Sequence, residues 1–304
     1  MISSLTLGNK TFPLNLIQGP LAGISCAPFR FLTWKYSQPA FSCTEMLSCK
    51  TLIHQQKKMY QRYVTKHPNE GPVCFQLFGD NAADLAIATK IAIDYGADLL
   101  DLNCGCPVKK VRRQNAGSCL LSEASRLYTM ITAMKQNSHL PVSVKIRVEG
   151  DGVEKFNHVI AQAVADAGAD FLVVHGRKWT DSYAVPCRYE QIQFFVEALK
   201  IPVIGNGDVC DLASLKKMFA TGCAGVMIAR AGIGKPWLIK KLSSEMCQKP
   251  FIMPTQAEID AMLTEHIELL AQFFGNEKHA YLHARKLIKH YKCSAELAHK
   301  IITH

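Results

Sequence analysis

Eight short apolar runs, each followed by a segment of helical composition, set the pattern of this 304-residue sequence. Apolar runs rich in strand-forming residues that alternate with helical segments are typical of βαβ units and a parallel sheet. Eight such units favour a closed TIM (β/α)8 barrel over an open sheet. The runs span Leu14 to Pro20, Ala40 to Glu45, Val73 to Phe78, Asp98 to Asn103, Val142 to Val148, Asp170 to His175, Pro202 to Asn206 and Gly225 to Ala229.

Three connections between a helical segment and the next run contain a glycine: Gly96, Gly168 and Gly222. Glycine at such a place supplies the left-handed residue that ends a helix, so we expect positive φ at all three. No Gly-x-Gly-x-x-Gly motif follows the first run, which argues against an open dinucleotide-binding sheet.

The chain changes character after Gln248. Lys249-Pro250 and Pro254-Thr255 interrupt it, and Thr255 with Glu258 has the spacing of a capping box that begins a helix. We therefore expect residues 1–248 to form the barrel and residues 249–304 to form a small helical domain.

Composition limits the class of protein. A hydrophobic share of 48% with 20% charged residues excludes a disordered chain or a coiled coil. The net charge of +10, from 35 basic and 25 acidic residues, favours a polyanionic partner such as nucleic acid. Twelve cysteines without a Cys-x-x-Cys pair fit neither a disulfide scaffold nor a zinc ribbon, and indicate a reducing cytoplasm. Without a signal peptide or a long apolar stretch, we expect no membrane contact, a cytoplasmic location and a monomer.

Polar residues gather after the fourth run, at the strand end where barrel enzymes carry their active sites. Asn103 ends this run, and Cys106 follows in a loop with four cations close behind, Lys109, Lys110, Arg112 and Arg113. Such a setting is expected to lower the pKa of the Cys106 thiol. Cys104 and Cys106 lack a partnering Cys or His at zinc spacing, so we expect no metal site.

Other strand ends are also polar. Lys145 interrupts an apolar run, so its side chain points either outward to a helix or into the barrel mouth. We favour the barrel mouth, because a fixed positive charge there can stabilise an anion. With Asn103, Gln76 and His175 it makes a ring of hydrogen-bonding groups suited to a planar heteroaromatic cofactor. The glycine-containing segments at the ends of the seventh and eighth runs, Ile204-Gly205-Asn206-Gly207-Asp208 and Ile228-Ala229-Arg230-Ala231-Gly232, predict a phosphate site.

These residues together resemble the tRNA-dihydrouridine synthases, and most closely their bacterial B-type branch. The most specific match is Asn-x-Gly-Cys-Pro at the fourth strand end, and the matching stretches follow the family order along nearly the whole chain. They are Gly19-Pro20-Leu21-Ala22-Gly23, Thr44-Glu45-Met46, Asp101-Leu102-Asn103-Cys104-Gly105-Cys106-Pro107, Ala116-Gly117-Ser118, Val144-Lys145-Ile146-Arg147, His175-Gly176-Arg177, Ile201-Pro202-Val203-Ile204-Gly205-Asn206-Gly207-Asp208 and Ala284-Arg285-Lys286.

The resemblance implies an enzyme that reduces uridine to 5,6-dihydrouridine in the tRNA D loop, with FMN as cofactor and NADPH as reductant. Cys106 would donate a proton to the uracil ring. The residues implied to bind FMN are Pro20, Leu21, Ala22, Gln76, Lys145, His175, Asn206, Gly207, Asp208, Ala229 and Arg230. Those implied to bind the tRNA substrate are Asn103, Lys109, Arg112, Arg177, Arg285, Lys286 and Lys289.

The chain departs from the family pattern at three places. Gly19-Pro20-Leu21 stands where the family has Ala-Pro-Met, and Lys178-Trp179 stands where it has threonine and arginine. The helical domain, ending at His304, is also shorter than the family leads us to expect. Two alternatives stay open: an FMN barrel of the dihydroorotate dehydrogenase type that acts on a free pyrimidine, and a tRNA-binding protein that lacks the reaction.

Overall fold

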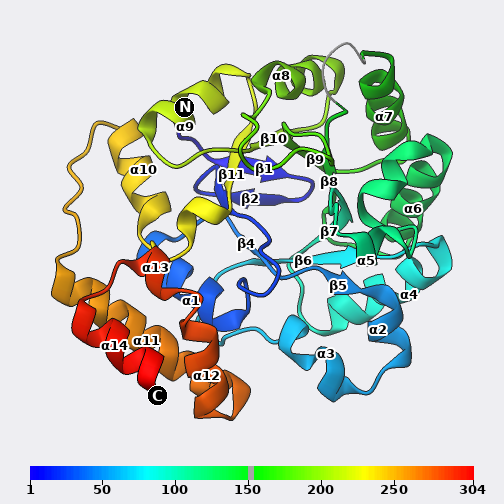
Figure 1. Ribbon diagram of the computed structural model, residues 1–304. Coiled ribbons are helices and arrows are strands. Elements are labelled where there is room, and N and C mark those ends of the chain that lie inside the picture. Colours follow the sequence, from blue (N-terminus) through cyan, green and yellow to red (C-terminus); the bar gives the residue numbers. More distant parts are fainter. Residues whose placement is uncertain (150–153) are drawn as a thin grey trace.

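A ring of parallel strands forms the centre of the computed structural model, which describes residues 1–149 and 154–304 (Figure 1). β4 pairs with both β3 and β6, so the sheet closes on itself. The TIM barrel prediction is confirmed, and each of the eight predicted runs contributes to the ring. Its strands are β3 (Leu16–Gln18), β4 (Ser42–Cys43), β6 (Val73–Phe78), β7 (Leu99–Cys104), β8 (Val142–Arg147), β9 (Phe171–His175), β10 (Val203–Asn206) and β11 (Gly225–Ile228).

Helices surround this ring and cover its outer face (Figure 1). They are α1 (Ala27–Ser37), α2 (Cys49–His54), α3 (Lys57–Val64), α4 (Ala82–Asp94), α6 (Ala124–Gln136), α7 (Glu154–Asp166), α8 (Tyr189–Ala198), α9 (Leu212–Ala220) and α10 (Leu238–Met246). The φ angles of Gly96, Gly168 and Gly222 are +84°, +74° and +80°, which confirms the predicted left-handed helix ends. Within the described part of the chain, no helix is long and apolar enough to cross a membrane.

The second predicted strand differs from the expectation. Instead of one run from Ala40 to Glu45, the chain forms β4 and then β5 (Leu47–Ser48), and both lie along β6. The segment between them leaves the ladder because Thr44 Oγ1 accepts a hydrogen bond from the backbone N–H of Gln76, at 3.1 Å. Glu45 is thereby directed to the loop after β3, where it accepts a hydrogen bond from the backbone N–H of Gly23.

An N-terminal hairpin, which the sequence did not lead us to expect, closes the opposite end of the barrel. Its strands β1 (Leu5–Leu7) and β2 (Lys10–Phe12) pair antiparallel. Phe12 packs against Phe41, whose ring lies 6.2 Å from that of Phe171 inside the barrel. This apolar plug fills the amino-terminal end, so the polar side chains face the carboxyl-terminal end.

Alternation along the strands decides which side chains enter the barrel. Leu100, Leu102 and Cys104 of β7 belong to the apolar layer between strands and helices, so Asp101 and Asn103 point inward. Asn103 lies beside Lys145 in the register of β7 with β8, and Lys145 therefore faces the interior as well. This confirms the inward placement that we favoured for Lys145.

The C-terminal helices pack directly on the barrel. They are α11 (Gln256–Phe274), α12 (Glu277–Ala284), α13 (Ile288–Tyr291) and α14 (Ala295–Thr303). Leu263 and Tyr291 share one buried apolar cluster with Phe29 of α1 and with Trp237, which precedes α10. The predicted capping box is present: Glu258 N–H donates to Thr255 Oγ1, and Thr255 N–H donates to the Glu258 carboxylate at 2.7 Å.

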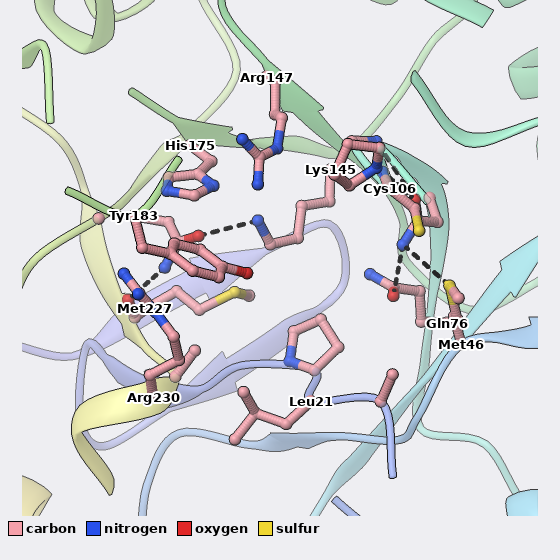
Figure 2. A pocket seen from close by; sticks show the side chains of 18 of the residues that line it. Leu21, Met46, Gln76, Cys106, Lys145, Arg147, His175, Tyr183, Met227 and Arg230 are labelled. Atoms are coloured by element: carbon pink, nitrogen blue, oxygen red, sulfur yellow. Dashed lines mark hydrogen bonds between the residues drawn. The ribbon is translucent and has the colours of Figure 1, made fainter. Parts of the chain in front are cut away.

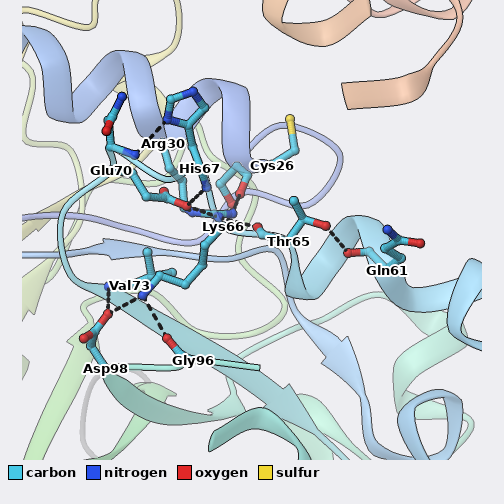
Figure 3. Close-up of polar contacts among 12 residues, drawn as sticks. Cys26, Arg30, Gln61, Thr65, Lys66, His67, Glu70, Val73, Gly96 and Asp98 are labelled. Atoms are coloured by element: carbon cyan, nitrogen blue, oxygen red, sulfur yellow. Dashed lines mark hydrogen bonds and ion pairs between the residues drawn. The ribbon is translucent and has the colours of Figure 1, made fainter. Parts of the chain in front are cut away.

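A buried ion pair holds the start of α1 (Figure 3). The side chains of Arg30 and Glu70 are 0% and 1% exposed, and Arg30 Nη2 lies 2.8 Å from Glu70 Oε1. Arg30 Nε donates to the second carboxylate oxygen, and Nη1 donates to the carbonyl of Ser25. Because breaking a buried pair leaves an uncompensated charge, this arrangement fixes the end of the loop that follows β3.

Candidate active site

One large cavity of about 880 Å³ opens at the carboxyl ends of the barrel strands (Figure 2). It brings together every residue that the resemblance implied for FMN, and also Cys106 and Asn103. The predicted residues in its lining are Pro20, Leu21, Ala22, Gln76, Asn103, Cys106, Lys145, His175, Asn206, Gly207, Asp208, Ala229 and Arg230. Residues from almost every strand end therefore converge on one place.

A buried hydrogen-bond chain lies beneath the cavity. Asp101 Oδ1 accepts from Ser143 Oγ at 2.6 Å, and Asp101 Oδ2 accepts from Gln76 Nε2 at 2.7 Å. Gln76 Oε1 then accepts from Asn103 Nδ2 at 2.8 Å. Burial raises the pKa of the Asp101 carboxyl to about 6, although the hydrogen bonds from Ser143 and Gln76 oppose this effect. Asp101 thus orients the amide of Gln76, and through it that of Asn103.

Asn103 in turn shapes the loop of Cys106. Its Oδ1 accepts from the backbone N–H groups of Gly105 and Cys106, at 3.2 and 2.9 Å. The Cys106 carbonyl accepts from Ser118 N–H at 3.1 Å. These bonds hold a half-buried thiol at the edge of the cavity.

The expected effect of the neighbouring cations on Cys106 was wrong. Burial raises the pKa of the Cys106 thiol, and the opposing charge comes from Arg147 rather than from the loop. Lys109, Lys110 and Arg113 follow Cys106 in sequence but are exposed, because the short helix α5 (Lys109–Arg112) carries them outward. The thiol is therefore kept protonated near neutral pH, which suits a proton donor better than a nucleophile.

Lys145 reaches the centre of the cavity (Figure 2). Its Nζ donates to Asn206 Oδ1 at 2.8 Å, and Asn206 Nδ2 donates to the carbonyl of Met227 at 2.8 Å. Burial, with a smaller contribution from the positive charge of Arg147, lowers the pKa of Lys145 to about 8. An anion bound beside Nζ would favour the charged form.

The far side of the cavity carries several cations. Arg230 stacks on the ring of Tyr183 at 3.5 Å and lies 3.6 Å from Asp208. Burial lowers the pKa of His175, and the positive charges of Lys145, Arg147, Arg177 and Arg230 lower it further, so the imidazole is neutral. The cations around this neutral ring make the region suited to an anionic group.

Arg177 does not lie on the cavity surface. Its side chain is 1% exposed, and Nη2 donates to both carboxylate oxygens of Asp208 at 2.6 Å. Nε donates to the carbonyl of Val185 at 2.6 Å. The burial favours a positioning role for Arg177, which holds Asp208, over the direct substrate contact that the resemblance implied.

The remaining residues implied to contact tRNA lie outside the cavity. Lys109, Lys286 and Lys289 are exposed. Arg285 Nη2 donates to the carbonyl of Ile302 at 2.9 Å and so ties α12 to the end of α14. Arg112 stacks on Trp179.

Arg147 and Tyr183 are among the cavity residues that we did not predict from the sequence. Arg147 lines the cavity near Cys106 and donates from Nη1 to the carbonyl of Lys178 at 2.8 Å. It lies two residues after Lys145, so strand alternation would have placed it on the same inward face. Tyr183 lies in the segment between β9 and α8, where no periodic pattern signals that a side chain enters a cavity.

Comparisons with known proteins match most of the chain. A family model described as dihydrouridine synthase matches residues 17–300. The chain is 31% identical to tRNA-dihydrouridine synthase B of Pseudomonas putida, over 90% of this chain and 82% of the relative. It is 31% identical to tRNA-dihydrouridine synthase B of Escherichia coli K12, over 94% and 89%. It is also 30% identical to a probable tRNA-dihydrouridine synthase of Rickettsia prowazekii, over 89% and 83%.

Proposed function

The chain belongs to the dihydrouridine synthase family and is similar to its B-type members, and from this premise we propose that it reduces uridine to 5,6-dihydrouridine in the D loop of tRNA. FMN is the proposed cofactor and NADPH the proposed reductant. The observation that carries the proposal is the convergence of Asn103, Cys106 and Lys145 on one cavity together with the predicted phosphate segments. The names of the similar proteins support a tRNA substrate.

The chemistry of the cavity fits FMN. Lys145 and Gln76 offer N–H groups near its centre, and Pro20 to Ala22 line one wall. The segments Asn206 to Asp208 and Ala229-Arg230 lie where a barrel holds a phosphate. Burial lowers the pKa of His175 there, and the positive charges of Lys145, Arg147, Arg177 and Arg230 lower it further, so this neutral ring lies among cations that can attract an anionic group. We propose that these residues hold the ring edge and the phosphate, respectively.

The reduction needs a hydride and a proton at the two carbons of one double bond in the uracil ring. FMN held in this cavity and reduced by NADPH would supply the hydride. Cys106 supplies the proton from Sγ to the neighbouring carbon, and its raised pKa keeps that proton in place until the base arrives. Asn103 orients the Cys106 loop through its backbone N–H groups.

The target base must leave the folded tRNA to reach this cavity. Turning a base out of its stack costs a few kcal/mol, which phosphate contacts at the protein surface offset. Three exposed lysines are suited to such contacts: Lys109 beside the mouth, Lys286 in the turn between α12 and α13, and Lys289 on α13. We propose that tRNA lies across both regions.

The paired substitutions Cys106→Ala and Cys104→Ala test the proposal. Cys106→Ala should bind FMN, oxidise NADPH and bind tRNA normally, but should form dihydrouridine about 10²- to 10⁴-fold more slowly, as expected when a general acid is lost. Cys104 is buried on the outer side of β7, so Cys104→Ala should keep most activity. The rate of dihydrouridine formation in a tRNA transcript is the measurement. Normal product formation by Cys106→Ala would exclude the thiol as the acid.

A further inference from the structure

Trp179 and Arg112 join two loops at the edge of the cavity. Arg112 ends α5, which follows β7, and Trp179 follows β9. The guanidinium carbon of Arg112 lies 3.4 Å from the centre of the Trp179 ring. β8 lies between β7 and β9 in the barrel, so this stack spans the end of β8.

Hydrogen bonds link the loops that carry Arg112 and Trp179 to residues of the candidate active site. Arg112 Nη1 donates to Ser118 Oγ at 3.0 Å, and Ser118 N–H donates to the carbonyl of Cys106 at 3.1 Å. On the other side, the carbonyl of Lys178, next to Trp179, accepts from Arg147 Nη1 at 2.8 Å. The stack therefore connects the backbone that carries the thiol with the arginine beside it.

Lys178 anchors the second loop independently of the stack. Its Nζ lies 3.0 Å from Glu149 Oε1, and its N–H donates to Asp181 Oδ2 at 2.8 Å. Trp179 thus projects from a restrained segment. A planar guanidinium can stack flat on an indole while the N–H groups at its edge donate hydrogen bonds, a geometry that the compact ammonium of a lysine does not offer.

We propose that Arg112 and Trp179 are positioning residues, which clamp the Cys106 loop so that the thiol keeps its place at the cavity edge. The catalytic part of this inference rests on the proposed role of Cys106 as the proton donor. An acid that is displaced by about 1 Å can lose about 10²-fold in rate, so a clamp far from the reacting atoms affects turnover. Arg112 then acts within the protein and not as the tRNA contact that the resemblance implied.

The experiment uses the flavin-loaded full chain with Trp179→Ala, Arg112→Ala, the double variant, and Trp179→Phe as the conservative replacement. The first readout needs no RNA: the rate at which iodoacetamide alkylates Cys106, followed by peptide mass spectrometry with exposed Cys247 as the internal reference. The second is the rate of a single turnover at saturating tRNA. The third is the salt dependence of tRNA binding.

Each alanine variant should alkylate faster at Cys106 and should turn over about 10- to 100-fold more slowly. The double variant should turn over no more slowly than the slower of the two single variants, because both substitutions remove the same stacking contact. Trp179→Phe should retain most of the native rate. Arg113→Ala, which removes a charge next to Arg112 but not the stack, should leave the alkylation rate at its native value.

Two results would overturn the clamp. In the first, Cys106 alkylation and the single-turnover rate stay native in both alanine variants. In the second, Arg112→Ala alone weakens tRNA binding and flattens its salt dependence while turnover at saturating tRNA stays native, which would make Arg112 a phosphate contact. If the native enzyme formed no dihydrouridine, the proposed function would fail, but the alkylation rates would still decide whether the clamp exists.

Discussion

Asp101 is the buried carboxyl on which the orientation of Gln76 and Asn103 depends. Burial raises its pKa from 3.8 to about 6, so the folded protein holds this proton more tightly than the unfolded chain does. Between about pH 4 and pH 6 the free energy of unfolding therefore falls as pH rises, by about 3 kcal/mol from this group.

Asp101→Asn should remove that contribution. Urea denaturation of the native protein and of the variant at pH 4.5 and pH 7 measures it, because the difference between the two proteins isolates Asp101 from other titrating groups. Relative to the native protein, the variant should gain stability at the higher pH. A difference that is equal at both pH values would contradict the assigned pKa.

Lys145 predicts a second pH dependence, this time in cofactor binding. Its pKa is lowered to about 8, so near pH 9 much of the side chain is neutral before a ligand binds. An anionic ligand that favours the charged form must then be bound together with a proton, and FMN affinity should fall as pH rises from 7 to 9. Quenching of FMN fluorescence measures this affinity. Lys145→Met should bind more weakly with little change over this range, and an equally steep dependence in the variant would assign the effect to another group.

At the scale of elements, the alternation of side chains along a strand indicated which residues enter the cavity. Closeness in the sequence did not indicate which charges lie near the Cys106 thiol. The pattern of β8 predicted an inward Lys145, and the same pattern applied two residues further would have found Arg147. Cys106 and its following cations are adjacent in sequence, yet α5 turns Lys109 and Lys110 to solvent. Which charge faces a loop thiol depends on helix orientation, and a single sequence does not specify it. Tyr183 had no signal because the segment between β9 and α8 has no periodic pattern.

The arrangement of the C-terminal helices also changes which basic residues we expect to contact RNA. Arg285 is exposed, as Lys286 and Lys289 are. Its guanidinium also donates to the carbonyl of Ile302 in α14, so its removal would break a contact between helices besides removing a charge. The double variant Lys286→Ala with Lys289→Ala should weaken tRNA binding and reduce the log–log salt slope by up to about two units. Lys216→Ala with Lys217→Ala, two exposed lysines on α9, is the matched control. Equal slopes for the two double variants would place α13 outside the RNA footprint.

At the scale of the whole molecule, the sequence predicted the barrel but not how its ends are closed. The strands of the N-terminal hairpin have three residues each, too few for a periodic signal. The break after Gln248 was visible, and a linker without helix or strand separates α10 from α11. The packing across that break was not visible, because it depends on Phe29 and Trp237 in the barrel meeting apolar side chains far along the chain.

The C-terminal helices touch the chain beside two of the loops that we propose for the cofactor. His283 Nε2 lies 2.8 Å from the carbonyl of Gly23, just after the Pro20 to Ala22 wall. Gly234, after β11, packs so closely on α13 that a Cβ there would lie 2.3 Å from the carbonyl carbon of His290. We infer that the two regions unfold together and that the helices support the cofactor loops.

This inference predicts the outcome of two changes. Removing residues 249–304 would expose Phe29 and Trp237, so the truncated barrel should aggregate or lose FMN rather than persist as a small-substrate enzyme. Gly234→Ala is the milder test: the clash with His290, together with the positive φ of +68°, should lower the melting temperature and speed FMN release. Calorimetry of the native chain should give one transition. Two separate transitions, with a truncated barrel that melts at the native temperature and keeps its flavin, would instead make residues 249–304 an independent domain that contributes to RNA binding alone.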